Sequence, residues 1–246
     1  MKKVILSVAL CSATVTLAGT ANADGASDFL SGSTNALVLG PTGIATPDAA
    51  YISDAENLYL DPNGYDGTTA TTVALTTPET DNFVTSVPQG EQDLINAIVA
   101  DYAAGEMDCN TSGVCSDPLT IFTYSQSSAV ASLAEPQLQA DAIPSDALRF
   151  VMLGANPSGV PDNLYPTEVY NINGDYYAQP GSDGTTLTGI ENGMLAHDAY
   201  LGLTPAEIGA ATPVVEGMTT VYDIPSLTTT QITEALLAAV PAGAGL

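Results

Sequence analysis

The stretch from Leu119 to Ser127 reads Leu-Thr-Ile-Phe-Thr-Tyr-Ser-Gln-Ser, and it decides the fold of this chain. Its apolar first half predicts a buried strand, and the small residues that follow at 128–134 predict a helix. The turn between them is so short that strand and helix nearly touch, which requires small side chains two positions before and after Ser125. Ser127 meets this requirement, whereas Thr123 is larger than the glycine that usually stands there. The stretch therefore predicts a serine at the apex of a strained turn.

The rest of the 246-residue chain alternates between short buried-strand patterns and amphipathic helix patterns. We predict strands at 36–39, 71–77, 119–122, 148–153, 168–172 and 218–222. We predict helices at 46–59, 91–104, from Ser125 to a break near Pro136, 190–195, 205–210 and 229–240. Strands that alternate with helices form a mostly parallel sheet covered on both faces. Together with the serine turn, this order predicts one α/β-hydrolase domain with a mostly parallel central sheet flanked by helices.

The first 23 residues have the composition of a secretory signal peptide. Lys2 and Lys3 form a basic start, residues 4–17 form an apolar segment, and Ala21-Asn22-Ala23 forms a small-residue cleavage site. The apolar segment is too short for a comfortable membrane span, so we expect no integral membrane segment after cleavage. We divide the chain into a signal peptide (1–23), a polar leader (24–35) and the hydrolase domain (36–246). We expect the protein to be secreted, either to the extracellular space or to the cell envelope.

The chain is strongly acidic, since 28 Asp and Glu against three Lys and Arg give a formal net charge of −25. Removal of the signal peptide takes away two lysines and no acid, so the charge becomes −27 and Arg149 is the remaining basic residue. Such a surface repels nucleic acid and anionic membrane headgroups, and we expect neither as a partner. The high aliphatic content distinguishes the chain from acidic disordered segments. The sequence indicates no particular protein partner.

Cys109 and Cys115 stand close together, around an Asn-Thr-Ser-Gly-Val segment. In an oxidising compartment a pair this close should form a disulfide, which we expect to stabilise the entry to the strand before Ser125. We expect no metal site, because the chain offers few soft ligands, and no redox site, because the Cys-X-X-Cys spacing is absent. No cofactor is needed for the chemistry considered below.

Polar residues follow four of the predicted strands, at the sheet edge where functional groups gather in parallel α/β folds. These residues are Thr42, Ser125, Asn156 and Asp175. The one histidine of the chain, His197, comes after them, so serine, aspartate and histidine stand in the α/β-hydrolase order. A serine needs a base to take its proton, and the base needs an acid to orient it. Asp183 is an alternative acid on the same loop, whereas Asp198 is a poor one because neighbouring side chains diverge.

Several short segments resemble, in order, those of the PE-PPE domain, a cutinase-like serine hydrolase domain. The segments are Leu39-Gly40-Pro41-Thr42-Gly43, Thr46-Pro47-Asp48, Tyr124-Ser125-Gln126-Ser127, Leu153-Gly154-Ala155-Asn156-Pro157, Asp175 and His197-Asp198-Ala199-Tyr200-Leu201. The resemblance covers about 36–226 and implies a cutinase-like α/β-hydrolase fold. This sequence departs from the family pattern at Thr123, at Tyr176-Tyr177-Ala178-Gln179, and in having a predicted signal peptide where family members have a helical PE or PPE module.

Carried over residue by residue, the resemblance implies a role for each member of the predicted site. Ser125 would be the nucleophile, His197 the general base and then the general acid, and Asp175 its orienting partner. The backbone N–H of Gln126 would be one donor of the oxyanion hole. The second donor would come from the loop after the first strand, at Thr42.

Three functions fit these residues. The first is a secreted esterase that hydrolyses lipid or other acyl esters through an acyl-enzyme on Ser125, with Tyr176 and Tyr177 either lining the acyl pocket or only packing. The second is an acyltransferase that passes the acyl group to trehalose or a glycolipid hydroxyl, which the resemblance permits. The third is a secreted binding protein on an inactive hydrolase scaffold, which Thr123 and the scarcity of cations favour. We adopt the first as the working hypothesis.

Overall fold

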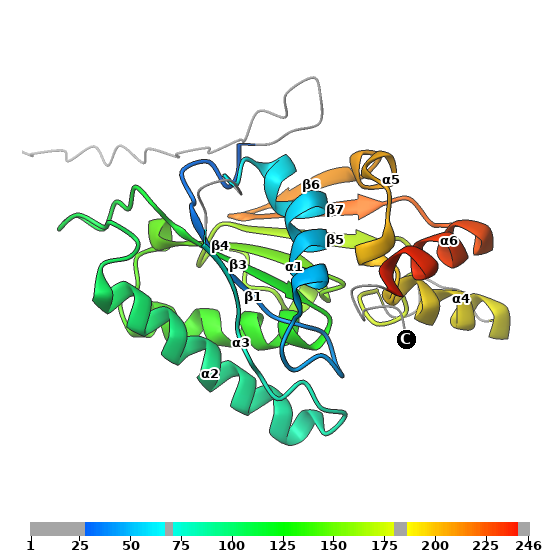
Figure 1. The fold of residues 1–246 in the computed structure, drawn as a ribbon, viewed down its shortest axis with the longest axis horizontal. Coiled ribbons are helices and arrows are strands. Elements are labelled where there is room, and N and C mark those ends of the chain that lie inside the picture. The colour runs from blue at the N-terminus through cyan, green and yellow to red at the C-terminus, as the bar shows by residue number, and fades with distance from the viewer. Residues whose placement is uncertain (1–27, 67–70, 180–185, 241–246) are drawn as a thin grey trace, which may run out of the picture.

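The computed structural model describes residues 28–66, 71–179 and 186–240, and its centre is a seven-stranded sheet (Figure 1). The strands lie in the order β2-β1-β3-β4-β5-β7-β6. Every neighbouring pair is parallel except β6 and β7, which are antiparallel. The strands are β1 (Asn35–Val38), β2 (Thr71–Ala74), β3 (Leu119–Tyr124), β4 (Leu148–Leu153), β5 (Thr167–Ile172), β6 (Thr212–Glu216) and β7 (Thr219–Ile224). The predicted mostly parallel α/β-hydrolase sheet is confirmed.

Helices cover both faces of this sheet. They are α1 (Ala49–Ala55), α2 (Phe83–Ala104), α3 (Gln126–Ala140), α4 (Leu187–His197), α5 (Pro205–Gly209) and α6 (Thr229–Ala239), and short 3-10 turns lie at Asp61–Asn63, Ser145–Ala147, Pro157–Gly159 and Tyr200–Gly202. Helices α2 and α3 pack on one face, while α1, α4 and α6 contribute to the core on the other (Figure 1). A π-helical turn, Glu56–Leu60, continues α1. The result is three layers with the sheet in the middle.

Alternate residues of the central strands divide between the two cores. In β4, Phe150 and Met152 belong to the core under α2 and α3, while Val151 and Leu153 belong to the core under α1 and α6. Successive side chains of a strand point to opposite faces, so a strand covered on both sides is apolar over most of its length. This accounts for the apolar runs at 36–39 and 150–153, within two of the predicted strands.

The structure corrects two helix predictions. The break predicted near Pro136 is wrong, because α3 continues to Ala140 with this proline inside it. Proline removes one hydrogen bond from a helix at a cost of about 3 kcal/mol. Burial of Leu138, beyond the proline, against the core under α3 offsets that cost. Helix α2 also begins at Phe83 rather than at residue 91, with Pro88 in its interior.

Two strand predictions also differ from the structure. Strand β2 ends at Ala74, whereas the prediction ran on to residue 77. Strand β6 was not predicted at all, because all five of its residues are exposed and give no buried pattern. It pairs only with β7, at the edge of the sheet.

The predicted disulfide between Cys109 and Cys115 is confirmed. It closes the loop that leads from α2 into β3, just before Leu119. The predicted signal peptide (1–23) and the alternative acid Asp183 lie outside the described residues. No helix in the described part of the chain is both long and apolar enough to cross a membrane.

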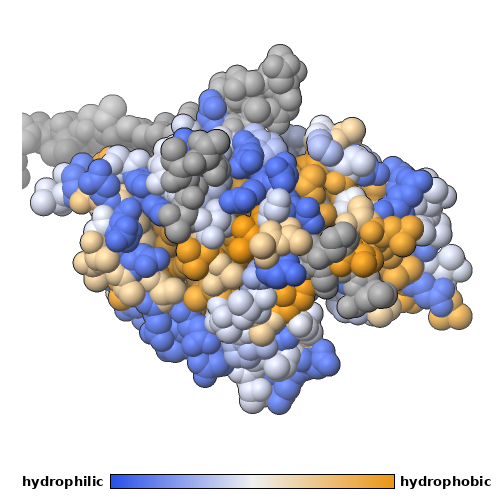
Figure 2. Space-filling view, in the orientation of Figure 1, coloured by the Kyte–Doolittle hydropathy of each residue, from blue (hydrophilic) through white to orange (hydrophobic). Residues whose placement is uncertain are grey.

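Exposed apolar side chains are prominent on α4 and α6. Leu187, Met194 and Leu195 are exposed on α4, and Leu237 is exposed on α6. Figure 2 shows apolar side chains among hydrophilic ones on the face that includes α6. Helix α4 ends at the buried residue His197.

Candidate active site

Ser125 occupies the tight turn between β3 and α3, as the sequence pattern predicts. Its backbone has φ 58° and ψ −116°, a conformation that residues other than glycine rarely adopt. The N–H of Ser125 donates to the carbonyl of Leu153 at 3.0 Å, which ties the turn to the end of β4. This geometry aims the serine side chain away from the sheet at the N-terminus of α3, where the helix dipole favours negative charge.

Hydroxyl groups on both sides of Ser125 stabilise the turn. The Ser127 hydroxyl accepts from the backbone N–H of Tyr124 at 2.9 Å and lies 3.0 Å from its carbonyl. Thr123, which replaces the usual glycine, is fully buried, and its hydroxyl lies 3.1 Å from that of Ser128. The Ser128 hydroxyl donates in turn to the carbonyl of Leu153 at 3.0 Å. The larger residue at position 123 is therefore accommodated by a hydrogen bond across the turn.

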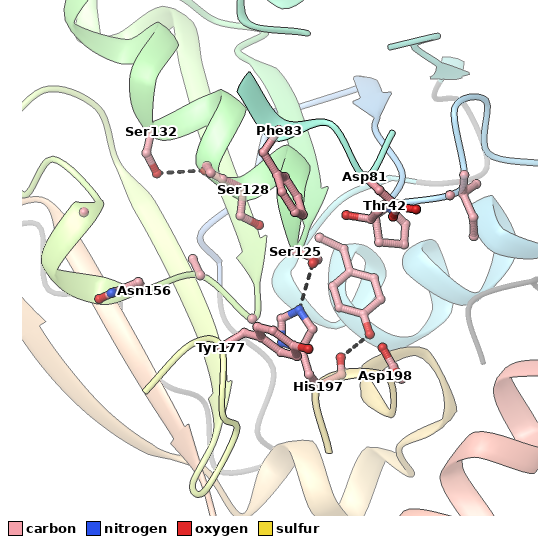
Figure 3. Close-up of a pocket in the computed structure, with 18 of the residues that line it drawn as sticks. Thr42, Asp81, Phe83, Ser125, Ser128, Ser132, Asn156, Tyr177, His197 and Asp198 are labelled. Carbon is pink, nitrogen blue, oxygen red and sulfur yellow. Dashed lines mark hydrogen bonds between the residues drawn. The ribbon is translucent and has the colours of Figure 1, made fainter. Parts of the chain in front are cut away.

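His197 lies between Ser125 and Asp175. Its Nε2 is 2.8 Å from the Ser125 hydroxyl, and its Nδ1 is 2.8 Å from one oxygen of Asp175 and 3.0 Å from the other (Figure 3 shows the serine contact). Because a carboxylate accepts hydrogen bonds, Nδ1 carries the proton and Nε2 is free to accept the serine hydroxyl proton. Three residues from the ends of β3, β5 and α4 thus form one hydrogen-bonded chain.

The Asp175 carboxylate is fully buried and fixed by further donors. Its Oδ1 accepts from the backbone N–H groups of Tyr177 at 2.8 Å and Ala178 at 3.0 Å. Its Oδ2 accepts from the Tyr200 hydroxyl at 2.7 Å. Burial, followed by the charge of Asp175, raises the pKa of Tyr200 well above its ordinary value, so this hydroxyl remains a donor. The carboxylate therefore has one orientation, with a lone pair directed at His197.

The His197 ring is held closely from several sides. Tyr124 donates a hydrogen bond from its hydroxyl to the His197 backbone carbonyl. The Tyr177 ring lies 4.8 Å from the imidazole, centroid to centroid. Gly154, with φ +60°, lies so close that a Cβ there would be 2.8 Å from Cε1 of the imidazole. The histidine is thus positioned by contacts from β3, from β4 and from the loop after β5.

A cleft of about 750 Å³ opens above Ser125 and His197. Its remaining walls include apolar and polar side chains: Ile44, Phe83, Ala129, Leu133 and Tyr177, together with Thr42, Asp81, Ser128, Ser132, Asn156 and Asp198. In Figure 3, Ser128, Ser132 and Asn156 lie on one side of Ser125, and Thr42 and Asp81 lie on the other. Among the residues that the structure describes, no lysine or arginine lines this cleft.

The loop after β1 reaches the cleft at Thr42. The N–H of Ile44 donates to the carbonyl of Pro41 at 3.0 Å, closing a turn whose third residue, Gly43, has φ +92°. The side-chain amide of Gln126 donates to the Thr42 hydroxyl at 3.3 Å. The two residues predicted to supply oxyanion donors are therefore in contact, next to Ser125.

The structure brings most of the predicted site residues together. Thr42, Ser125 and His197 line one cleft. Asp175 is buried and hydrogen-bonded to His197, and Gln126 is hydrogen-bonded to Thr42. Asn156 lines the same cleft but is exposed, and its Oδ1 accepts from the N–H and hydroxyl of Ser158.

The structure also places the residues near the site whose roles the sequence analysis did not settle. Tyr177 lines the cleft, whereas Tyr176 packs edge-on against Tyr177. Asp198 lines the cleft without being the acid bonded to the imidazole, and burial raises its pKa. Sequence reasoning missed the roles of Tyr200 and Gly154, although both stood in the segments singled out. The described residues hold no cluster of three or more His, Cys, Asp or Glu side chains suited to a metal ion.

A mostly parallel sheet, a strained serine at a strand–helix turn and a serine–histidine–aspartate hydrogen-bonded chain together define the fold as that of an α/β-hydrolase. Within that class, residues 65–174 match the PE-PPE domain. The predicted resemblance to this family is confirmed.

Two curated proteins of Mycobacterium tuberculosis are similar in sequence. The uncharacterized PPE family protein PPE28 is 32% identical over 216 residues, which are 72% of this chain and 31% of that protein. Esterase PE16 is 28% identical over 225 residues, which are 76% of this chain and 40% of that protein. The chain thus matches less than half the length of either relative. A novel cutinase-like protein from Cryptococcus sp. aligns with a TM-score of 0.48 and 14% identity, over 70% of this chain and 97% of that one.

Proposed function

We propose that this protein is a serine esterase that hydrolyses carboxylic esters through an acyl-enzyme on Ser125. The single observation that carries the proposal is the hydrogen-bonded chain Ser125–His197–Asp175, with 2.8 Å at each of its two closest contacts. The relative named Esterase PE16 supports an ester as the substrate. The buried, four-fold hydrogen-bonded Asp175 carboxylate supports a role in orienting the imidazole and stabilising its protonated form.

In the first half-reaction, the Ser125 hydroxyl oxygen attacks the ester carbonyl carbon while His197 Nε2 takes the hydroxyl proton. The carbonyl oxygen becomes an oxyanion, which accepts hydrogen bonds from the backbone N–H groups of Gln126 and Thr42. Its position at the N-terminus of α3 adds the favourable field of the helix. The tetrahedral intermediate then expels the alcohol, which leaves with the proton from His197. The acyl group remains on Ser125.

In the second half-reaction, water enters the cleft and gives a proton to His197 Nε2 as its oxygen attacks the acyl carbon. The second tetrahedral intermediate collapses, releases the carboxylic acid and returns the proton from His197 to Ser125. Each oxyanion donor contributes on the order of 10²–10³ in rate in enzymes of this kind.

The cleft supports acyl or lipid esters as the substrate class. Phe83, Leu133 and Tyr177 are large apolar residues on its walls, and each is about half exposed to solvent. Apolar walls bind an acyl chain by removing its surface from water. The described part of the lining contains no lysine or arginine, which disfavours an ester with an anionic headgroup.

We also propose that residues 1–23 are a cleaved signal peptide and that 36–246 form the hydrolase domain of a secreted protein. The disulfide between Cys109 and Cys115 supports an oxidising compartment. Expression of the whole chain in a secreting host tests this. Extracellular protein that begins at Asp24 is expected, and protein that stays inside the cell with Met1 intact contradicts it.

Turnover of p-nitrophenyl butyrate tests the enzymatic proposal. The purified protein is expected to release p-nitrophenol and butyric acid, and Ser125→Ala is expected to abolish this. Ser31→Ala, an exposed serine on the N-terminal side of β1, is the matched control and should keep full turnover. Equal turnover by the Ser125→Ala variant would overturn the proposal, and no turnover by folded wild-type protein would favour the inactive-scaffold reading.

A further inference from the structure

Backbone hydrogen bonds join the segment after β1, which carries Thr42, to the segment after β2. Leu75 N–H donates to the Val38 carbonyl at 2.9 Å, and Thr77 N–H donates to the Ala45 carbonyl at 3.0 Å. The last and shortest of these backbone bonds runs from Gly43 N–H to the Glu79 carbonyl, at 2.6 Å. Residue 79 is therefore bonded directly to the neighbour of Thr42.

Glu79 holds this position in a strained conformation. Its φ is +41°, in the left-handed region that residues other than glycine seldom occupy, at a cost of about 1–3 kcal/mol. Such a conformation persists only where the surroundings impose it. The side chain supplies that constraint here, because it is buried and its Oε1 accepts from the Thr77 hydroxyl at 2.9 Å. This side-chain hydrogen bond thus helps to hold the backbone whose carbonyl accepts from Gly43.

The Glu79 carboxyl takes no part in the serine–histidine–aspartate chain. Its second oxygen, Oε2, is buried without a hydrogen-bond partner among the described residues. Burial raises the pKa of Glu79 to about 7, and the hydrogen bond from Thr77 opposes part of that rise. A half-satisfied buried carboxyl destabilises a fold. Stability therefore does not explain why a carboxyl group stands at residue 79.

The Gln126 side chain, like that of Glu79, has one polar atom that is hydrogen-bonded to a described residue and one that is not. Its amide nitrogen donates to the Thr42 hydroxyl at 3.3 Å, and its amide oxygen is buried without a partner. Thr42 and Gly43 are thus each bonded to a residue that keeps one unsatisfied oxygen in the interior. The turn is held by two contacts, one from α3 and one from Glu79.

We propose that Glu79 is a positioning residue for the oxyanion hole: it fixes the 41–44 turn so that the Thr42 N–H faces the site where the oxyanion forms beside Ser125. This inference rests on the proposed function, since it assigns Glu79 a task in that same reaction. Glu79 acts through Gly43 and Thr42 and does not touch the substrate. Loss of its side chain leaves the backbone free to relax, which moves the turn and misaligns the donor.

The test compares Glu79→Ala, Glu79→Gln and Thr77→Val on a neutral activated ester such as p-nitrophenyl butyrate. Glu79→Ala removes the anchor and is expected to lower kcat by about 10- to 100-fold, a part of what loss of a whole oxyanion donor costs. KM should stay within about twofold, because the large apolar wall residues Phe83, Leu133 and Tyr177 lie outside the 41–44 turn. Glu79→Gln keeps an oxygen that accepts from Thr77 and should restore kcat to within about threefold of wild type.

Thr77→Val keeps the size of residue 77 and its backbone bond to Ala45 but removes the hydroxyl that anchors Glu79. It is expected to lower kcat in the same direction as Glu79→Ala. This variant decides the test if Glu79→Ala fails to fold. Wild-type kcat in the Thr77→Val protein overturns the inference, as does a Glu79→Ala effect confined to KM. Wild-type protein without Ser125-dependent turnover overturns the proposed function instead, before any variant is compared.

Discussion

Gly154 and His197 are fitted to one another so closely that no side chain has room between them. A Cβ at residue 154 would lie 2.8 Å from Cε1 and 3.1 Å from Nδ1 of the imidazole. The backbone of Gly154 also has φ +60°, which L side chains rarely adopt. The glycine at the end of β4 therefore sets how far the histidine ring can move toward the sheet.

Gly154→Ala is expected to displace the His197 ring and lower kcat/KM for p-nitrophenyl butyrate by more than about tenfold, since small misplacements of catalytic groups are costly. The matched control is Gly159→Ala, because Gly159 lines the same cleft and a Cβ there meets nothing within 4 Å. The control should keep wild-type kinetics. Equal kcat/KM in the two variants would show that this close approach does not position the ring.

Tyr200→Phe removes the hydroxyl that donates to Asp175 Oδ2 and accepts from the Ile172 N–H. We expect kcat to fall by about tenfold, corresponding to roughly 1.4 kcal/mol for a hydrogen bond to a charged group. Asp175→Asn should cost far more, on the order of 10⁴, because the imidazole then loses its tautomer control. Steady-state kinetics measure both. Tyr102→Phe on α2 is the control, and a Tyr200→Phe protein as active as this control would contradict the assigned role.

Glu135 makes stability depend on pH. It is fully buried in α3, both carboxylate oxygens lack hydrogen-bond partners in the part of the chain that the structure describes, and burial raises its pKa from 4.5 to about 9. The folded state therefore holds a proton that the unfolded state releases. The free energy of unfolding should fall by up to about 1.4 kcal/mol per pH unit from this group as pH rises between those two values. Urea titrations at pH 5, 7 and 8.5 measure the fall.

Glu135→Gln removes the titration while keeping the shape of the side chain. The variant should be more stable than wild type at pH 8.5 and should show a flatter dependence on pH. Glu234→Gln, at an exposed position on α6, is the control for the loss of one negative charge. If both variants flatten the curve equally, general charge repulsion and not the buried carboxyl is responsible.

The disulfide between Cys109 and Cys115 closes a short loop before β3. Replacing both cysteines by serine is expected to lower the free energy of unfolding by about 2 kcal/mol. Activity at 25 °C should remain, because the loop lies at the N-terminal end of β3 and Ser125 follows its C-terminal end. A reductant should lower the melting temperature of wild type and leave that of the double variant unchanged. A double variant as stable as wild type would contradict this role.

The elements that position the site could be predicted because local signals specify them. The central strands β3 and β4 are buried on both faces, so they appear in the sequence as largely apolar runs that end at a polar residue or a turn. His197 could be singled out because the chain has one histidine. Asp175 was ambiguous against Asp183, since order along the chain does not say which carboxylate points at the ring.

Other features could not be predicted because they arise from contacts between distant segments. The Tyr200 hydroxyl reaches Asp175 only after the turn beyond α4 folds back on the end of β5. The strained backbone of Glu79 serves a turn that lies more than thirty positions earlier in the chain. Helix α3 continues past Pro136 because tertiary packing overrides a local signal for a break.

Reaction of the folded protein with a fluorophosphonate probe, with the adduct located by mass spectrometry, tests most directly whether Ser125 is an activated nucleophile. One adduct on Ser125 is expected in the wild-type protein. None is expected in Ser125→Ala, and in His197→Ala the labelling rate should fall by several orders of magnitude. Absence of an adduct on folded wild-type protein, or labelling of Ser125 that does not depend on His197, would contradict it.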